Sequence, residues 1–275
     1  MADKIALSAG VRSNLLSLQG TTKAIGTTQT RLSSGLKVNS ALDDASAFFT
    51  SVALSNRAAD LNTLKSDIDL SISTIESAIN GIDGITELVQ QAKGLANQAK
   101  ATGDTNEKST LAVQFNALLT QIDDLANDSS FNGTNLIQAT PDTLTVEFNE
   151  DGTSDLTITG LDSTTGASGL AIDAAANAFV SSTDVDGALS DLNSALTELR
   201  TNAATLGSNS TVLQTRISFT ADLVNTLDTG AGKLTLADLN EESANLLALQ
   251  TRQQLGINSL SLASQSERSI LALFG

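Results

Sequence analysis

The sequence lacks several side chains on which enzymes and metal sites commonly depend. Its 275 residues include no Cys, His, Trp or Tyr. The chain therefore has no disulfide, no thiolate or imidazole zinc site, and no catalytic dyad or triad built on Cys or His. Only carboxylate, hydroxyl, lysine and arginine chemistry remains, and no spacing of those groups indicates a catalytic constellation. We expect no enzyme activity, no metal site and no cofactor.

Basic residues are also scarce. Lys and Arg total 15 against 31 Asp and Glu, which gives a formal net charge of −16. Affinity for nucleic acid depends on basic side chains that displace counterions, so we expect no nucleic-acid partner. No basic residue lies between Lys108 and Arg200, and this stretch holds 14 acids. Either the middle of the chain faces water while the ends face protein, or the middle is a polar insertion.

Proline occurs once, and long apolar runs are missing. Scarce proline favours long uninterrupted helices. A membrane-spanning helix needs a run of about 18 apolar residues, and the sequence contains no such run, so no membrane span is predicted. The first residues, 1–6, lack the apolar stretch of a secretory signal, so we expect a protein that is cytosolic or leaves the cell without a cleaved signal.

Apolar residues recur with a mean spacing of 3.5 between Leu61 and Val89, the period of a coiled coil. We predict a long helix from about Ser40, where Asp43 and Asp44 resemble a capping box, to residues 100–103. A second helix is expected after an N-cap at Asp104, with Glu107 three residues on.

Further along, residues 144–148 and 156–158 alternate between apolar and polar side chains around a turn at 149–152, which predicts a β-hairpin. Helix is expected again from about Thr183, and from Leu234 to Phe274. The predicted fold is mainly α: a long antiparallel coiled-coil-like helix bundle made from both chain ends, with a small β-hairpin excursion in the middle.

Both terminal stretches carry an apolar face. Each such side chain contributes about 1.5 to 3 kcal/mol when fully buried. Two helices of this length cannot bury both faces against each other, so the termini must pack on the rest of the chain or on copies of themselves. The candidate core and interface residues are Leu7, Val11, Leu15, Leu18, Ile25, Leu32, Leu246, Leu249, Leu255, Leu260, Ile270, Leu271, Leu273 and Phe274.

Three segments carry a family resemblance. Residues 31–45 (RLSSGLKVNSALDDA) resemble the N-terminal signature of bacterial flagellins, in which a basic residue often stands at the position of Leu42. Residues 237–274 resemble the C-terminal signature, and residues 130–136 (SFNGTNL) match a third motif. The resemblance covers roughly residues 1–137 and 184–275.

The resemblance implies a structural subunit that self-assembles into the helical flagellar filament for motility. Residues 1–40 plus 235–275 would form an inner-core helix pair, and residues 41–137 plus 184–234 an outer-core helical rod. Residues 138–183 would form a surface hairpin and loops. It further implies export as an unfolded chain through the flagellar secretion channel, an export chaperone, hook-associated and cap proteins as partners, and an extracellular location in the filament.

Four polar residues lie where the inner pair would give way to the outer rod: Arg31, Asn39, Asp43 and Asp44. We expect subunit contacts there, or, for the two aspartates, capping of their own helix.

The stretch that resembles the recognition site of the vertebrate Toll-like flagellin receptor, residues 91–96, has Gln91 and Gly94 where stimulatory flagellins carry Arg and Glu. We therefore expect weak or no receptor recognition.

Two alternatives remain open. A hook-filament junction protein of the same family shares the terminal helices. A secreted surface adhesin or binding module would use the acidic middle of the chain as its binding face.

Overall fold

The computed structural model describes residues 9–274, with side chains as far as Ser269. The chain divides into two compact units, a terminal unit (Met1–Asn56 and Thr226–Gly275) and a central unit (Arg57–Asn225). The fold is mainly α with one β-hairpin, as predicted. Its elements are α1 (Ala9–Ser34), α2 (Ala45–Ala101), α3 (Thr105–Asp128), β1 (Thr143–Glu147), β2 (Asp155–Thr159), the short 3-10 helix η1 (Ala176–Phe179), α4 (Ser182–Thr235) and α5 (Leu239–Phe274).

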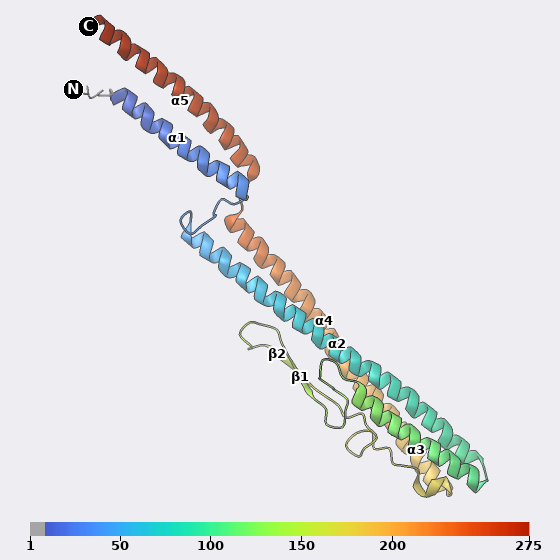
Figure 1. Cartoon of the computed structure of the whole chain (residues 1–275). Helices are drawn as coiled ribbons and strands as arrows, with labels where there is room; N and C mark the ends of the chain where they lie inside the picture. The colour runs from blue at the N-terminus through green and yellow to red at the C-terminus, as the bar shows by residue number, and fades with distance from the viewer. Residues whose placement is uncertain (1–8, 275) are drawn as a thin grey trace. The chain divides into compact units, whose positions relative to one another are not determined.

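In the terminal unit, α1 and α5 pack side by side and antiparallel (Figure 1). The least exposed apolar residues of α1 recur every seven positions, at Val11, Leu18, Ile25 and Leu32. This is the heptad repeat of a coiled-coil contact. The connector between α1 and α2, residues 35–44, is bound to the C-terminal end of α4, since the Lys37 N–H donates to the Thr235 carbonyl over 2.7 Å.

The core of the central unit lies between α2, α3, α4 and the hairpin (Figure 1). The 3.5-residue spacing predicted in α2 is confirmed by a row of buried side chains, among them Ile68, Ile75 and Ile82. Phe115 of α3 and Phe179 of η1 are fully buried and meet edge to face, with ring centroids 5.2 Å apart.

Two glycines of α2 permit this close packing. A Cβ atom on Gly81 would lie 2.7 Å from Ile137 Cδ1, and one on Gly84 would lie 2.8 Å from Leu125 Cδ2. Glycine in a helix interior costs about 1 kcal/mol relative to alanine. Here that cost is offset by the near approach of α3 and the chain that follows it.

The hairpin pairs β1 with β2 in antiparallel register, with Leu144 opposite Ile158 and Val146 opposite Leu156. Its turn is anchored to both long helices. The Arg57 Nε donates to Glu150 Oε1 over 2.6 Å, and the Arg216 guanidinium lies 4.6 Å from the centre of the Phe148 ring. The pKa of Glu150 is lowered, mainly because its own backbone N–H binds the carboxylate and further because of Arg57.

The predicted start of the long helix was wrong. Instead of beginning near Ser40, α2 begins at Ala45, because Asp43 closes a separate turn and Asp44 is the cap, accepting from the Ala47 N–H over 3.0 Å. The N-cap predicted at Asp104 is confirmed by its bond from the Asn106 N–H, 2.8 Å.

Candidate assembly surface

The contact between α1 and α5 mixes apolar and polar layers. Thr21 and Thr28 occupy buried positions midway between the apolar ones, with 8% and 6% of their surface exposed. At one end Arg31 Nη1 donates to Glu242 Oε1 over 3.0 Å, and Glu242 is only 8% exposed. Because polar side chains fill so many positions, this contact contributes less burial energy than an apolar coiled coil of the same length.

One position fits a large side chain against a glycine. A Cβ atom on Gly256 of α5 would lie 2.7 Å from Leu18 Cδ1 of α1. Leu18 therefore occupies the space that any other residue at position 256 would fill. Together with the pairing of Arg31 and Glu242, this fit sets the register of the two helices.

The structure separates the candidate terminal residues into two groups. One group lies buried or half-buried along the contact between α1 and α5, and the other points away from it. The first group is Val11, Leu18, Ile25, Leu32, Leu246, Leu249 and Leu260, and the second is Leu255, which is 62% exposed; Leu15, which is 37% exposed, lies between the two groups. Leu7 and the side chains of Ile270, Leu271, Leu273 and Phe274 lie outside the described residues.

Sequence reasoning missed several outward apolar residues. Leu16, Leu247 and Leu262 are 74%, 67% and 70% exposed, and Ile257 is 45% exposed. A helical wheel that placed Val11, Leu18 and Ile25 on the inner face would have put Leu16 outside it. Within residues 9–269 these side chains remain exposed on the helix pair, so this surface is available to another protein molecule.

In the connector, the two aspartates are used within the chain. Asp43 Oδ2 accepts from the Asn39 N–H, the Ser40 N–H and the Ser40 hydroxyl, at 3.1, 3.0 and 3.1 Å. These bonds favour the carboxylate and lower the pKa of Asp43. Asn39 is exposed and contributes its backbone to this turn. The lining of a hollow beside the turn includes Arg31, Asn39 and Asp43.

Asp43→Ala is expected to loosen the connector at neutral pH. The pKa of Asp43 is lowered in the folded protein, so its stabilisation is present above the ordinary aspartate pKa of about 4 and is lost as the pH falls through the lower folded value. Hydrogen exchange at residues 39 and 40 should be faster in the variant at pH 7. The difference from wild type should shrink below pH ~4.

Asp151→Ala, which removes an exposed acid at the hairpin turn, serves as the matched control and should leave connector exchange unchanged. Equal protection of residues 39 and 40 in wild type and Asp43→Ala at pH 7 would contradict the role given to the carboxylate.

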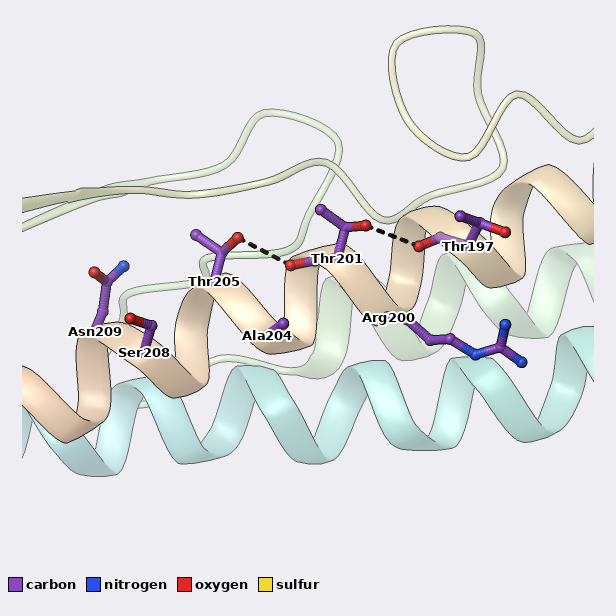
Figure 2. Close-up of a pocket in the computed structure, with 7 residues that line it drawn as sticks. All are labelled: Thr197, Arg200, Thr201, Ala204, Thr205, Ser208 and Asn209. Carbon is purple, nitrogen blue, oxygen red and sulfur yellow. Dashed lines mark hydrogen bonds between the residues drawn. The ribbon is translucent and has the colours of Figure 1, made fainter.

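The central unit carries a hollow along α4 that is lined largely by threonine, serine and asparagine side chains. Figure 2 shows its lining, in which Thr201 and Thr205 each bond to the carbonyl four residues earlier, at 3.0 and 2.9 Å. Each of these hydroxyls donates its proton to a backbone carbonyl, which is a common interaction of threonine within a helix. Across residues 9–274, no cluster of three or more acidic side chains could hold a metal ion.

None of the described helices is both long and apolar enough for a membrane span. The molecule is a mainly α protein that packs its two ends together and leaves apolar surface on the resulting pair. These are features of a structural protein that associates with further chains.

Comparison with known proteins defines the family. The model of the bacterial flagellin N-terminal helical region matches residues 9–142, and that of the C-terminal helical region matches residues 189–274. The chain is 34% identical to flagellin FljM of Caulobacter vibrioides, over 99% of this chain and 98% of that one. It is 29% identical to a flagellin of Brucella melitensis, over 94% and 95%. A crystal structure of Bacillus cereus flagellin aligns with 56% of this chain and 88% of its own, with 16% identity and a TM-score of 0.49.

The chain belongs to the bacterial flagellin family. It is therefore a structural subunit of the flagellar filament, as the sequence motifs predicted. Neither the fold nor the comparisons favour a junction protein or an adhesin. Flagellins form the extracellular flagellar filament and are a family of structural proteins.

Proposed function

We propose that this chain polymerises through the apolar residues that α1 and α5 leave exposed. The observation that carries the proposal is the exposure of Leu16, Leu247 and Leu262 on the helix pair that α1 and α5 form. Each side chain contributes about 1.5 to 3 kcal/mol when a neighbouring copy buries it fully. Repetition of a contact between two different surfaces produces a helical polymer.

The division into inner and outer regions follows from this proposal. Residues 1–40 and 235–275 would form the inner core, residues 41–137 and 184–234 the outer rod, and residues 138–183 the surface hairpin. The charge distribution supports it. The terminal unit holds eight basic and eight acidic residues, whereas the central unit holds seven basic and 23 acidic, so the whole net charge of −16 belongs to the central unit.

The family resemblance extends the proposal to the route of assembly. The chain would be exported unfolded through the flagellar secretion channel, with a chaperone on its C-terminal helix, and would meet hook-associated and cap proteins at the growing structure. The absence of Cys supports this route, because no disulfide can form in the chain before it is threaded.

Weak recognition by the Toll-like flagellin receptor is also part of the proposal. Gly94 offers no side chain, and the hollow around it is lined by uncharged residues, among them Gln91, Leu95 and Gln98. A reporter-cell assay in which the purified protein matches the potency of a stimulatory flagellin would contradict this expectation.

The proposed function is tested by reassembly. Purified protein is depolymerised by heat, mixed with filament seeds, and imaged by negative stain. Long filaments of uniform diameter are expected. Failure to form them under seeding, together with normal filaments in a strain that lacks this chain, would refute the assignment as a filament subunit.

Polymerisation is expected to require salt. Central units of neighbouring copies repel each other, and the screening length falls from about 30 Å at 0.01 M salt to about 8 Å at 0.15 M. The critical concentration, measured by sedimentation, should drop several-fold over this range. Changing the exposed Asp60, Asp69 and Glu76 to amides should weaken the dependence. A critical concentration that does not vary with salt would rule out this repulsion.

A further inference from the structure

A set of exposed apolar residues lies at the end of the connector and along the first turns of α2. We term it the connector face, and it consists of Leu42, Ala45, Phe49, Val52 and Ala53. Leu42 is 98% exposed, Phe49 62% and Val52 38%. Residues 45, 49, 52 and 53 are three or four positions apart and so share one side of the helix. No charged residue occurs from Ala45 to Asn56.

The connector face is held in a fixed geometry. The Asp43 N–H donates to the Ser40 carbonyl over 3.1 Å, which closes the turn that carries Leu42. Asp44 caps α2 immediately afterwards. Phe48 is half-buried and meets the Phe49 ring edge to face, with centroids 5.6 Å apart. An apolar face ordered in advance loses little conformational entropy when it is covered, so its binding is stronger.

The opposite side of the same helix is already occupied. Ser51 is 8% exposed, and Leu54 is half-buried against α4, where a Cβ atom on Gly230 would lie 3.5 Å from Leu54 Cδ1. The connector face is therefore the free side of a docked helix. Its exposure cannot be removed by rotating α2, because rotation would expose the packed side.

The charge and chemistry of the face favour a second copy of this chain as its partner. The five residues of the face are uncharged, and the carboxylates of Asp43 and Asp44, between Leu42 and Ala45, are engaged in the connector turn and the helix cap. The terminal unit has no net charge, so another copy approaches it without net repulsion from this unit. Leu16, Leu247 and Leu262, the proposed assembly residues, belong to the same unit, and filament subunits meet copies of themselves.

We propose that the connector face packs against a second copy in the filament, and that Leu42 becomes buried there. This inference rests on the proposed function, since it requires the chain to polymerise. It assigns the subunit contact in the connector to an apolar side chain, whereas Asn39, Asp43 and Asp44 form the turn that presents it.

The test uses the absence of native Cys. Leu42→Cys introduces a unique thiol, whose rate of reaction with a maleimide is measured in monomer and in filaments. Ala167→Cys, in an exposed loop of the central unit, is the matched control. We expect the thiol at position 42 to react at least about tenfold more slowly in filaments, and the thiol at position 167 to react equally in both. Equal rates at position 42 would overturn the proposal.

A second pair of variants covers the case in which Leu42→Cys does not polymerise. Leu42→Met should polymerise with a critical concentration within about threefold of wild type, and Leu42→Asp should raise it at least about tenfold. Both should keep the monomer's helical circular dichroism. A Leu42→Asp variant that polymerises like wild type would overturn the inference. Wild-type protein that forms no filaments would instead refute the proposed function.

Discussion

Removal of residues 245–275 will abolish polymerisation and leave the central unit folded. The deletion takes away most of α5 and exposes the α1 side chains that pack against it, among them Leu18 and Ile25. The core of the central unit is formed by α2, α3, α4 and the hairpin and does not involve these residues. Sedimentation and negative stain should show no filaments, whereas circular dichroism should still show a cooperative helical unfolding transition.

A point variant separates the helix contact from the loss of chain. Gly256→Leu places a large side chain where Leu18 already lies, so it should block polymerisation in the full-length chain. Adding Leu18→Ala to the same protein frees that space and should restore filaments. If the truncated chain polymerises, or if Gly256→Leu alone polymerises with the critical concentration of wild type, the pairing of α1 with α5 is not needed for assembly.

Phe115→Ala will destabilise the central unit by about 3–5 kcal/mol, the usual range for a buried phenylalanine. Phe115 is fully buried and packs edge to face on Phe179 at 5.2 Å, so the substitution leaves a cavity and removes an aromatic pair. Urea unfolding followed by circular dichroism measures the free energy of unfolding. The urea midpoint should fall sharply with little change in slope.

Phe49→Ala is the matched control, because Phe49 is 62% exposed in the single chain. Its free energy of unfolding should change by less than about 1 kcal/mol. If both variants unfold at the wild-type urea concentration, the assignment of Phe115 to the core is wrong. A large loss in the Phe49 variant would mean that its ring supports the monomer rather than an intermolecular contact.

The helices of the central unit were predictable because apolar spacing and burial follow the same period. The row of isoleucines in α2, the N-cap at Asp104 and the alternation in the hairpin each reflect local rules that residues obey within a few positions of one another. By local rules alone, Gly81 and Gly84 only weaken α2. Their packing role depends on chain more than forty residues away, which a local pattern does not contain.

The terminal unit was predicted less completely. The apolar face of α1 was recognised, but the pattern did not separate Leu18, which meets Gly256, from Leu15, which remains 37% exposed. The turn at Asp43 was also misjudged. Two adjacent acids near a helix start satisfy the capping pattern equally well, and only the backbone course shows that Asp43 closes one turn while Asp44 caps the next.

Two specific contacts between α1 and α5 together favour one alignment of the two helices. Leu18 meets Gly256 and Arg31 meets Glu242, so the contacts lie thirteen residues apart on α1 and fourteen on α5. A slip of one heptad would place Leu249 beside Arg31 and leave Glu242 without its arginine partner. It would also bring Leu18 against Ala263 instead of Gly256. Both contacts are lost together when the helices slip, so this alignment of α1 with α5 is favoured over its neighbours.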